Sequence, residues 1–185
     1  MEKLVEKKKN QRKLYRYSRE GKVEEVRSIL STGINPNSSF TDANIIIPLF
    51  AAIHGDHAAV VKLLLNMGAD PNLGDEVGIT PLHYAAISGN SGTVMKMLLV
   101  AGGDPNKGNG LGDQPLHWAA TTFHTEKVRL LLDAGADPNA TNVAGKTPLY
   151  WPKFMALNGH GHEDLLELLV ERGAKMPMHK TWMTS

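Results

Sequence analysis

Apolar residues recur along the chain in short clusters, and turn-forming residues separate one cluster from the next. The clusters include VRSIL, VVKLLL, VMKMLL, VRLLL and LLELLV, and Gly, Pro and Asn occur between them. Apolar positions three and four residues apart lie on the same face of a helix. The pattern therefore predicts an all-α fold made of short helices, each with one buried face.

The clusters are part of a longer repeat that carries two motifs. IPLFAA, TPLHYAA, QPLHWAA and TPLYWP begin at residues 47, 80, 114 and 147, at steps of 33 or 34 residues. GINPN, GADPN, GGDPN and GADPN begin at residues 33, 68, 102 and 135, at steps of 33 to 35 residues. A fixed period of this length is typical of a solenoid of stacked units.

Each unit has the start and stop signals of two helices. Thr80 can cap the first helix, and Pro81 suits its first turn, where a missing N–H has no cost. Gly102 is placed to end the second helix in the left-handed conformation that Gly accepts easily. One such unit cannot bury its own apolar face, whereas stacked units can.

The period and the two motifs resemble those of the ankyrin repeat family over residues 12–175. The resemblance implies an ankyrin-repeat solenoid of stacked antiparallel helix pairs, with projecting β-turn loops (the finger loops) and a concave groove. Some positions depart from the family pattern. Phe50 and Tyr150 replace the usual His, Ile47 and Gln114 replace the usual Thr, and Phe123 replaces the Gly of the inter-helix turn.

The repeat divides the chain into seven predicted parts. They are a basic N-terminal segment (1–11), an N-terminal capping helix pair (12–40), ankyrin repeats 1 (41–73), 2 (74–107) and 3 (108–140), an atypical repeat 4 with an insertion (141–175) and a C-terminal tail (176–185).

Composition and charge narrow the class of protein. The chain has no cysteine, its longest apolar run (residues 45–53) is too short to cross a bilayer, and its N-terminus lacks the apolar core of a signal peptide. We therefore expect an intracellular monomer, cytoplasmic rather than nuclear, without membrane insertion. Residues 1–22 hold nine Lys/Arg and three Glu, a balance of +6, so the remainder carries −5.

Candidate chemistry is sparse. The resemblance gives His83 and His117 a structural role in the turn, and the sequence has no catalytic triad, phosphate loop or nucleotide fingerprint. His160, His162, Glu163 and Asp164 have ligand chemistry for zinc, but they coincide with the inter-helix turn and the start of a helix. We therefore expect no enzyme activity, no cofactor and no metal site.

Two surfaces are candidates for binding. The run KKKNQRK (7–13) is either a nucleic-acid or localisation element or the solvated tip of the cap. The resemblance places the groove on the first helix of each repeat, where Tyr84, Trp118 and Trp151 share one helical position. These aromatic rings form either a binding stripe or lateral packing between repeats.

The function predicted from the groove is non-enzymatic binding of an unidentified protein partner. The alternative is a nucleic-acid or anionic-surface binder that uses the basic N-terminal segment; nucleic acid is disfavoured because the rest of the chain is acidic. The predicted partner-binding residues are Asn44, Ile46, Glu76, Ile79, Tyr84, Ile87, Leu111, Asp113, Trp118, Thr121, Thr122, Lys146, Trp151 and Phe154.

Repeat 4 departs most from the pattern. Trp151, Phe154 and Met155 lie on one helical face, Pro152 takes the place of an Ala, and about five residues are added before the second helix resumes at Glu163. This repeat is either a degenerate end repeat or a modified end of the groove, and the tail (176–185) can close it as a cap.

Overall fold

The computed structural model describes residues 2–38, 47–89, 92–158 and 162–175. In these ranges the chain forms ten α-helices and no strand, which confirms the all-α prediction. The helices form five consecutive pairs. They are α1 (Glu2–Glu20) with α2 (Val23–Leu30), α3 (Pro48–His54) with α4 (Ala58–Asn66), α5 (Pro81–Ile87) with α6 (Thr93–Val100), α7 (Pro115–Thr121) with α8 (Thr125–Asp133), and α9 (Tyr150–Leu157) with α10 (Glu163–Glu171).

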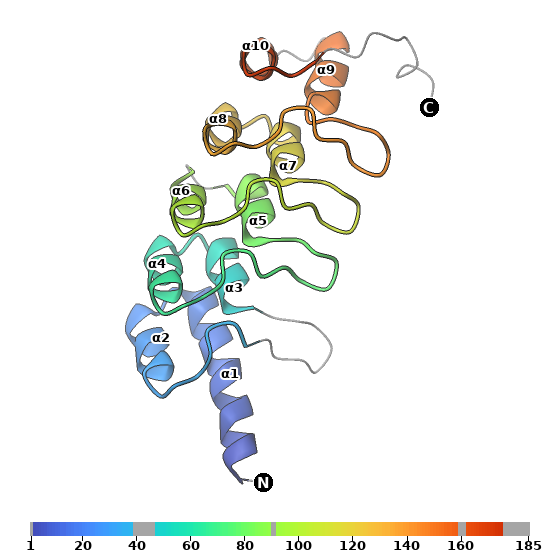
Figure 1. The fold of residues 1–185 in the computed structure, drawn as a ribbon. Helices are drawn as coiled ribbons and strands as arrows, with labels where there is room; N and C mark the ends of the chain where they lie inside the picture. The colour runs from blue at the N-terminus through green and yellow to red at the C-terminus, as the bar shows by residue number, and fades with distance from the viewer. Residues whose placement is uncertain (1, 39–46, 90–91, 159–161, 176–185) are drawn as a thin grey trace.

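The pairs stack into two columns with the finger loops on one side. The odd-numbered helices form the column nearest the loops, and the even-numbered helices form a second column on the side away from the loops (Figure 1). We call these the inner and the outer column. The core lies between them, where Leu82 and Ala85 of α5 and Met95 and Leu98 of α6 are fully buried. Stacking therefore buries the apolar face that a single unit leaves open.

Helix α1 joins the basic segment to the body of the protein. It runs without a break through most of residues 1–11 and on to Glu20. Its second half is packed, because Leu14 and Ser18 are fully buried. Residues 5–9 are all exposed. The predicted boundary at residue 11 therefore falls inside a helix, and the remaining divisions of the chain stay predictions.

The helix ends follow the sequence signals. Helix α5 begins at Pro81 with Thr80 as its N-cap residue, and Gly102 follows α6 with a φ of 89°. Phe123 has a φ of 57°, so the chain keeps the left-handed turn although Phe replaces Gly. The Phe123 ring stacks on the His162 ring, with centroids 3.7 Å apart and an interplanar angle of 9°. This contact holds the turn after α7 against the residue that precedes α10.

Asparagines of the second motif connect successive repeats. The Asn72 side chain donates from Nδ2 to the Gly102 carbonyl (2.8 Å) and accepts at Oδ1 from the Asp104 N–H (2.7 Å). The same pair of side-chain bonds to the backbone of the following repeat is made by Asn37, Asn106 and Asn139. Each turn is therefore held by the next one, which fixes the register of the stack.

Helix α9 begins later than α5 and α7 do relative to the motif. Those two helices start at the Pro of the motif, whereas α9 starts at Tyr150, two residues after Pro148. Pro152 has no N–H to donate to the Pro148 carbonyl, so the first helical bond runs from the Lys153 N–H to the Leu149 carbonyl (3.1 Å). The later residues extend α9 to Leu157, and α10 resumes at Glu163, as predicted.

Candidate functional site

The finger loops are built by side chains that bond to their own backbone. Asp75 Oδ1 accepts from the N–H groups of Val77 (3.1 Å) and Ile79 (2.9 Å). Asn109 and Asn142 do the same in the next two loops. Such local bonds favour a turn over a helix. They give the loops one shape in successive repeats.

Backbone bonds also join neighbouring loops. The Gly110 N–H donates to the Val77 carbonyl (2.7 Å), and the Val143 N–H donates to the Leu111 carbonyl (2.9 Å). The Asn142 amide donates to the Asp113 carboxylate (2.7 Å). The loops therefore form a connected row, and a partner would meet them in a fixed arrangement.

Two buried histidines fix these loops to the inner helices. His83 Nδ1 accepts from the Thr80 N–H (3.1 Å), and its Nε2 bonds the Asp113 carbonyl (2.7 Å). His117 likewise bonds the Gln114 N–H (3.1 Å) and the Lys146 carbonyl (3.0 Å). Burial lowers the pKa of both imidazoles, so the neutral form is favoured. The geometry confirms the structural role expected for both residues.

Three hollows follow one another along the inner column. The first is lined by residues that include Tyr15, Phe50 and Tyr84. The second, between α3 and α5, includes Tyr84 and Ile87. The third, of about 470 Å³, includes Ile87, Trp118 and Trp151. Tyr84 borders the first and second hollows and Ile87 borders the second and third, so the three hollows adjoin one another in a row, which we call the inner groove.

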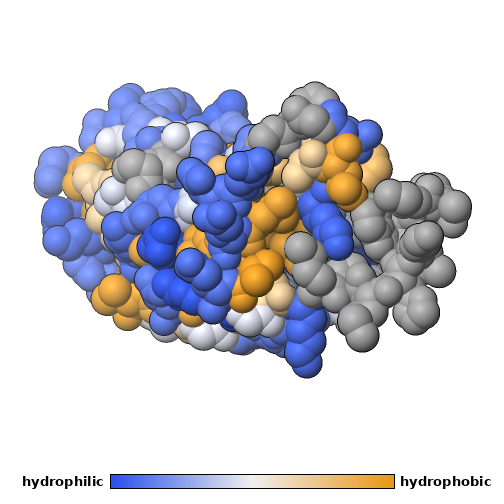
Figure 2. Space-filling model, turned by 90° about the horizontal axis from the view of Figure 1, so that it is seen from above, coloured by the Kyte–Doolittle hydropathy of each residue, from blue (hydrophilic) through white to orange (hydrophobic). Residues whose placement is uncertain are grey.

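The groove presents apolar surface to solvent. Of the lining residues, Ile87 is 46% exposed and Trp151 44%, and Phe154, which contacts Trp151 outside the hollows, is 39% exposed. Seen from the end of the stack that carries α9 and α10, a large hydrophobic area lies near the middle of the face, and smaller hydrophobic patches lie among hydrophilic surface elsewhere (Figure 2). Apolar side chains of this size carry much of the binding energy in protein interfaces.

Exposure of the aromatic position increases along the stack. Ala51 is buried, Tyr84 and Trp118 are half-buried, and Trp151 is exposed. The Tyr84 ring packs against Phe50, with centroids 4.9 Å apart, and the Trp118 ring packs against His83 at 5.1 Å. Lateral packing therefore holds Tyr84 and Trp118, whereas Trp151 is open to solvent. That this row is a binding stripe stays a prediction.

The structure brings many of the predicted contact residues together. The third hollow is lined in part by Ile87, Asp113, Trp118, Thr121, Lys146 and Trp151. Tyr84 lines the other two hollows. These residues lie on α5, α7, α9 and the connecting finger loops, so residues from three repeats meet at one place.

Other predicted residues lie at the margins. Glu76 and Leu111 are exposed in the finger loops, and Ile79 is half-buried. Thr122 directly follows α7 as its C-cap residue, and its hydroxyl donates to the Ala119 carbonyl (2.9 Å). The Phe154 ring meets the Trp151 ring with centroids 5.9 Å apart. Asn44 and Ile46 lie outside the described residues.

Comparison with known proteins agrees with the repeat seen in the structure. The family model for ankyrin repeats (three copies) matches residues 14–106 and 88–179. The chain belongs to the ankyrin repeat family. Ankyrin repeats are generally protein–protein interaction modules, and the family is typically non-enzymatic.

Similar proteins come from distant organisms. A fowlpox virus protein named as an ankyrin repeat protein, FPV222, is 38% identical over 71 residues, which is 38% of this chain and 9% of that protein. A Pyrobaculum aerophilum protein (PAE1861) is 41% identical over 70 residues, 38% of this chain and 25% of its own length. A Schizosaccharomyces pombe protein (P1E11.10) is 38% identical over 63 residues. The chain spans less than a third of the length of each of these relatives.

Several groove residues were not predicted from the sequence. Asn142 lines the third hollow, and its place in the ankyrin repeat, equivalent to Asp75 and Asn109, was a usable signal. Tyr15 and Arg19 reach the first hollow from α1. No motif marked those two residues, because they precede the first repeat motif, IPLFAA, which begins at residue 47.

A buried lysine supports the end of α5 in the middle of the ankyrin stack. Lys127 is 2% exposed and occupies the position that is Val60, Val94 and Leu165 in other repeats. Its ammonium donates to the carbonyls of Ala85 (2.8 Å) and Ser88. Burial lowers the Lys127 pKa, and the charge of Asp56 opposes that shift. Lys127 therefore satisfies carbonyls at the end of the helix that carries Ile87.

The predicted absence of a metal site stays a prediction. Within the described ranges, no group of three or more His, Asp or Glu side chains is placed to hold a metal ion. His162 is stacked on Phe123, and His160 lies outside the described residues. Over the same ranges, no helix is both long enough and apolar enough to span a bilayer.

Proposed function

We propose that this ankyrin repeat chain binds a partner protein through the inner groove and the adjoining finger loops. The observation that carries the proposal is the row of adjoining hollows, in which Ile87 and Trp151 are exposed beside the half-buried rings of Tyr84 and Trp118. The large apolar side chains that line the third hollow, Ile87, Trp118 and Trp151, suit apolar side chains of a partner.

The polar groups beside the third hollow add specificity. Asp113 and Lys146 both line it. Lys146 Nζ lies 4.2 Å from the centre of the Tyr150 ring and 5.1 Å from that of Trp151. His83 bonds the Asp113 carbonyl and His117 bonds the Lys146 carbonyl, and we call these two contacts the histidine clamps. The clamps fix the backbone from which the side chains of Asp113 and Lys146 extend. Opposite charges at an apolar site orient a partner more than they add affinity.

Site-specific photo-crosslinking tests this proposal. Thr121 is exposed and lines the third hollow, whereas Arg129 is exposed on α8 in the outer column. A crosslinking amino acid at position 121 should capture a protein from cells, and the same amino acid at position 129 should not. Thr121→Arg should abolish capture from a second groove position, Ile87, without a change in helix content.

Thr121 is a better test position than Thr122. Both hydroxyls donate to a carbonyl three residues earlier, Thr121 to Trp118 (2.7 Å) and Thr122 to Ala119 (2.9 Å). Thr122 is half-buried, however, so a large side chain there would also disturb the fold, whereas Thr121 is exposed. Equal capture from positions 121 and 129, or unchanged capture in the Thr121→Arg variant, would count against the groove.

A further inference from the structure

Helix α1 carries exposed basic side chains along one face. We call this set the basic stripe. It consists of Lys8, Arg12, Arg16 and Arg19, all of which are exposed. Spacings of four, four and three residues put them on one side of the helix, and at 1.5 Å per residue they span about 16 Å.

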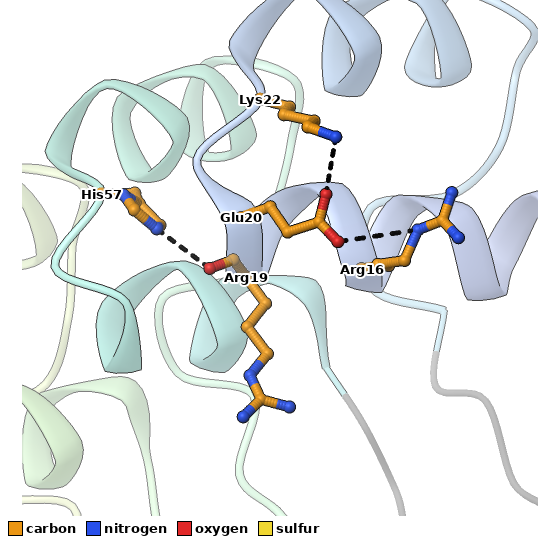
Figure 3. Close-up of polar contacts among 5 residues, drawn as sticks. All are labelled: Arg16, Arg19, Glu20, Lys22 and His57. Carbon is orange, nitrogen blue, oxygen red and sulfur yellow. Dashed lines mark hydrogen bonds and ion pairs between the residues drawn. The ribbon is translucent and has the colours of Figure 1, made fainter.

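Acidic side chains of the chain itself compensate only part of this charge. Glu20 pairs with Lys22 (2.8 Å) and Arg16 (3.8 Å), and the Arg19 side chain points away from Glu20 (Figure 3). The first turns of α1 project past α2 and α3 at the end of the stack (Figure 1). Residues 1–22 keep a balance of +6 against −5 for the rest of the chain.

The stripe leads to the inner groove. Arg19 lines the first hollow together with Tyr15, Phe50 and Tyr84. The Arg19 carbonyl also bonds the His57 ring (Nε2 to O, 2.9 Å), which ties this end of α1 to the turn between α3 and α4 (Figure 3). A partner that fills the first hollow therefore has the stripe beside it.

We propose that the partner protein places an acidic segment along the basic stripe while its apolar side chains occupy the inner groove. This inference rests on the proposed function of the groove. Positive charge is concentrated in residues 1–22, and the rest of the chain has a net negative charge. A long nucleic acid would extend past the stripe and be repelled by the acidic remainder of the chain. An acidic protein segment can be short enough to meet only the stripe. The stripe presents charge and no large apolar side chain, so it steers association and responds to salt.

A peptide of ten glutamates with a fluorescent label tests the stripe on the full chain by anisotropy. It should bind at about 50 mM salt and weaken on the order of tenfold at about 300 mM salt, because exposed charges are screened. Lys8→Glu with Arg12→Glu should weaken binding at low salt by about tenfold or more. Lys62→Glu with Arg129→Glu gives the same change in net charge on the outer helices α4 and α8, and should change binding less than about twofold.

The controls separate this inference from its rivals. Circular dichroism shows whether both double variants keep their helix content, and Lys8→Gln with Arg12→Gln provides a milder change at the same positions. Absence of peptide binding, equal loss in the two double reversals, or tighter binding of a ten-residue oligothymidylate than of the peptide would overturn it. None of these outcomes affects crosslinking from position 121, so failure here is distinguishable from failure of the groove.

Discussion

Helices α7 and α9 occupy the same place in successive repeats, but their first turns differ. In α7 the helix begins at Pro115, and the His117 ring bonds both Gln114 and the next finger loop. In α9 the helix begins at Tyr150, which takes the position of that histidine. The Tyr150 ring lies under the Lys146 ammonium instead. Repeat 3 is therefore tied to the following finger loop by its histidine, whereas repeat 4 has no histidine at this position.

Loss of the histidine alone does not explain the later start of α9. Helix α3 has Phe50 at the histidine position and still begins at Pro48. The feature specific to α9 is Pro152, which stands where α7 has Ala119 and removes a backbone donor in the first turn. The proline therefore sets where α9 begins, whereas the histidine sets how firmly a helix is tied to the next loop.

The difference has a consequence for binding. Trp118 is half-buried against His83, whereas Trp151 is exposed and contacts Tyr150 and Phe154 of its own helix. An aromatic ring held by the preceding repeat contributes to stability, and one left open can contribute to a partner. The regular repeats thus support the groove, and repeat 4 supplies its most exposed aromatic ring, Trp151.

The largest expected effect comes from removing a clamp. His117→Ala leaves the Gln114 N–H and the Lys146 carbonyl without their partner, and should lower the free energy of unfolding by about 3 kcal/mol. Tyr150→Ala, at the same position of repeat 4, should lower it by less than about 1 kcal/mol. Urea denaturation of both variants measures the difference. Equal losses would show that the clamp is not what distinguishes the two repeats.

A smaller effect is expected in acid. Burial lowers the pKa of His83 and His117 in the folded protein, so the unfolded chain takes up protons first as the pH falls. The stability of the neutral clamps is therefore complete above about pH 6.5 and is lost as the pH falls through the folded pKa values. The unfolding free energy, measured by urea denaturation at several pH values in this range, should depend less steeply on pH in a His83→Gln/His117→Gln variant. A His54→Gln/His124→Gln variant, in which both changed residues are exposed, should keep the wild-type slope.

Much of the fold could be predicted from the sequence because similar helix start and stop signals recur in successive repeats. The Thr80–Pro81 start, the Gly102 stop and the structural role of His83 could all be predicted from the residues or from the family they resemble. Lys127 could not, because a lysine in an apolar helix pattern is ordinarily taken as exposed, and only the fold brings it to the carbonyls that end α5.

The candidate site was less accessible to prediction than the fold. The sequence identified the helical position shared by Tyr84, Trp118 and Trp151, but not how much of each ring is exposed. Exposure depends on what the preceding repeat places against the ring, Phe50 in one case and His83 in another. The contribution of α1 to the first hollow was missed for a related reason, since it is created by packing and not by a motif.

We expect Trp151 of repeat 4 to be the accessible aromatic anchor of the inner groove for a partner. The most direct test is the affinity of Trp151→Ala for the partner captured from position 121, measured together with urea denaturation. The account predicts a loss of about 2 kcal/mol of binding free energy, roughly thirtyfold, with a change of less than about 1 kcal/mol in unfolding free energy. Val100→Ala, which changes a 90% exposed apolar residue in the outer column, should leave affinity unchanged. Wild-type affinity in Trp151→Ala would contradict the account.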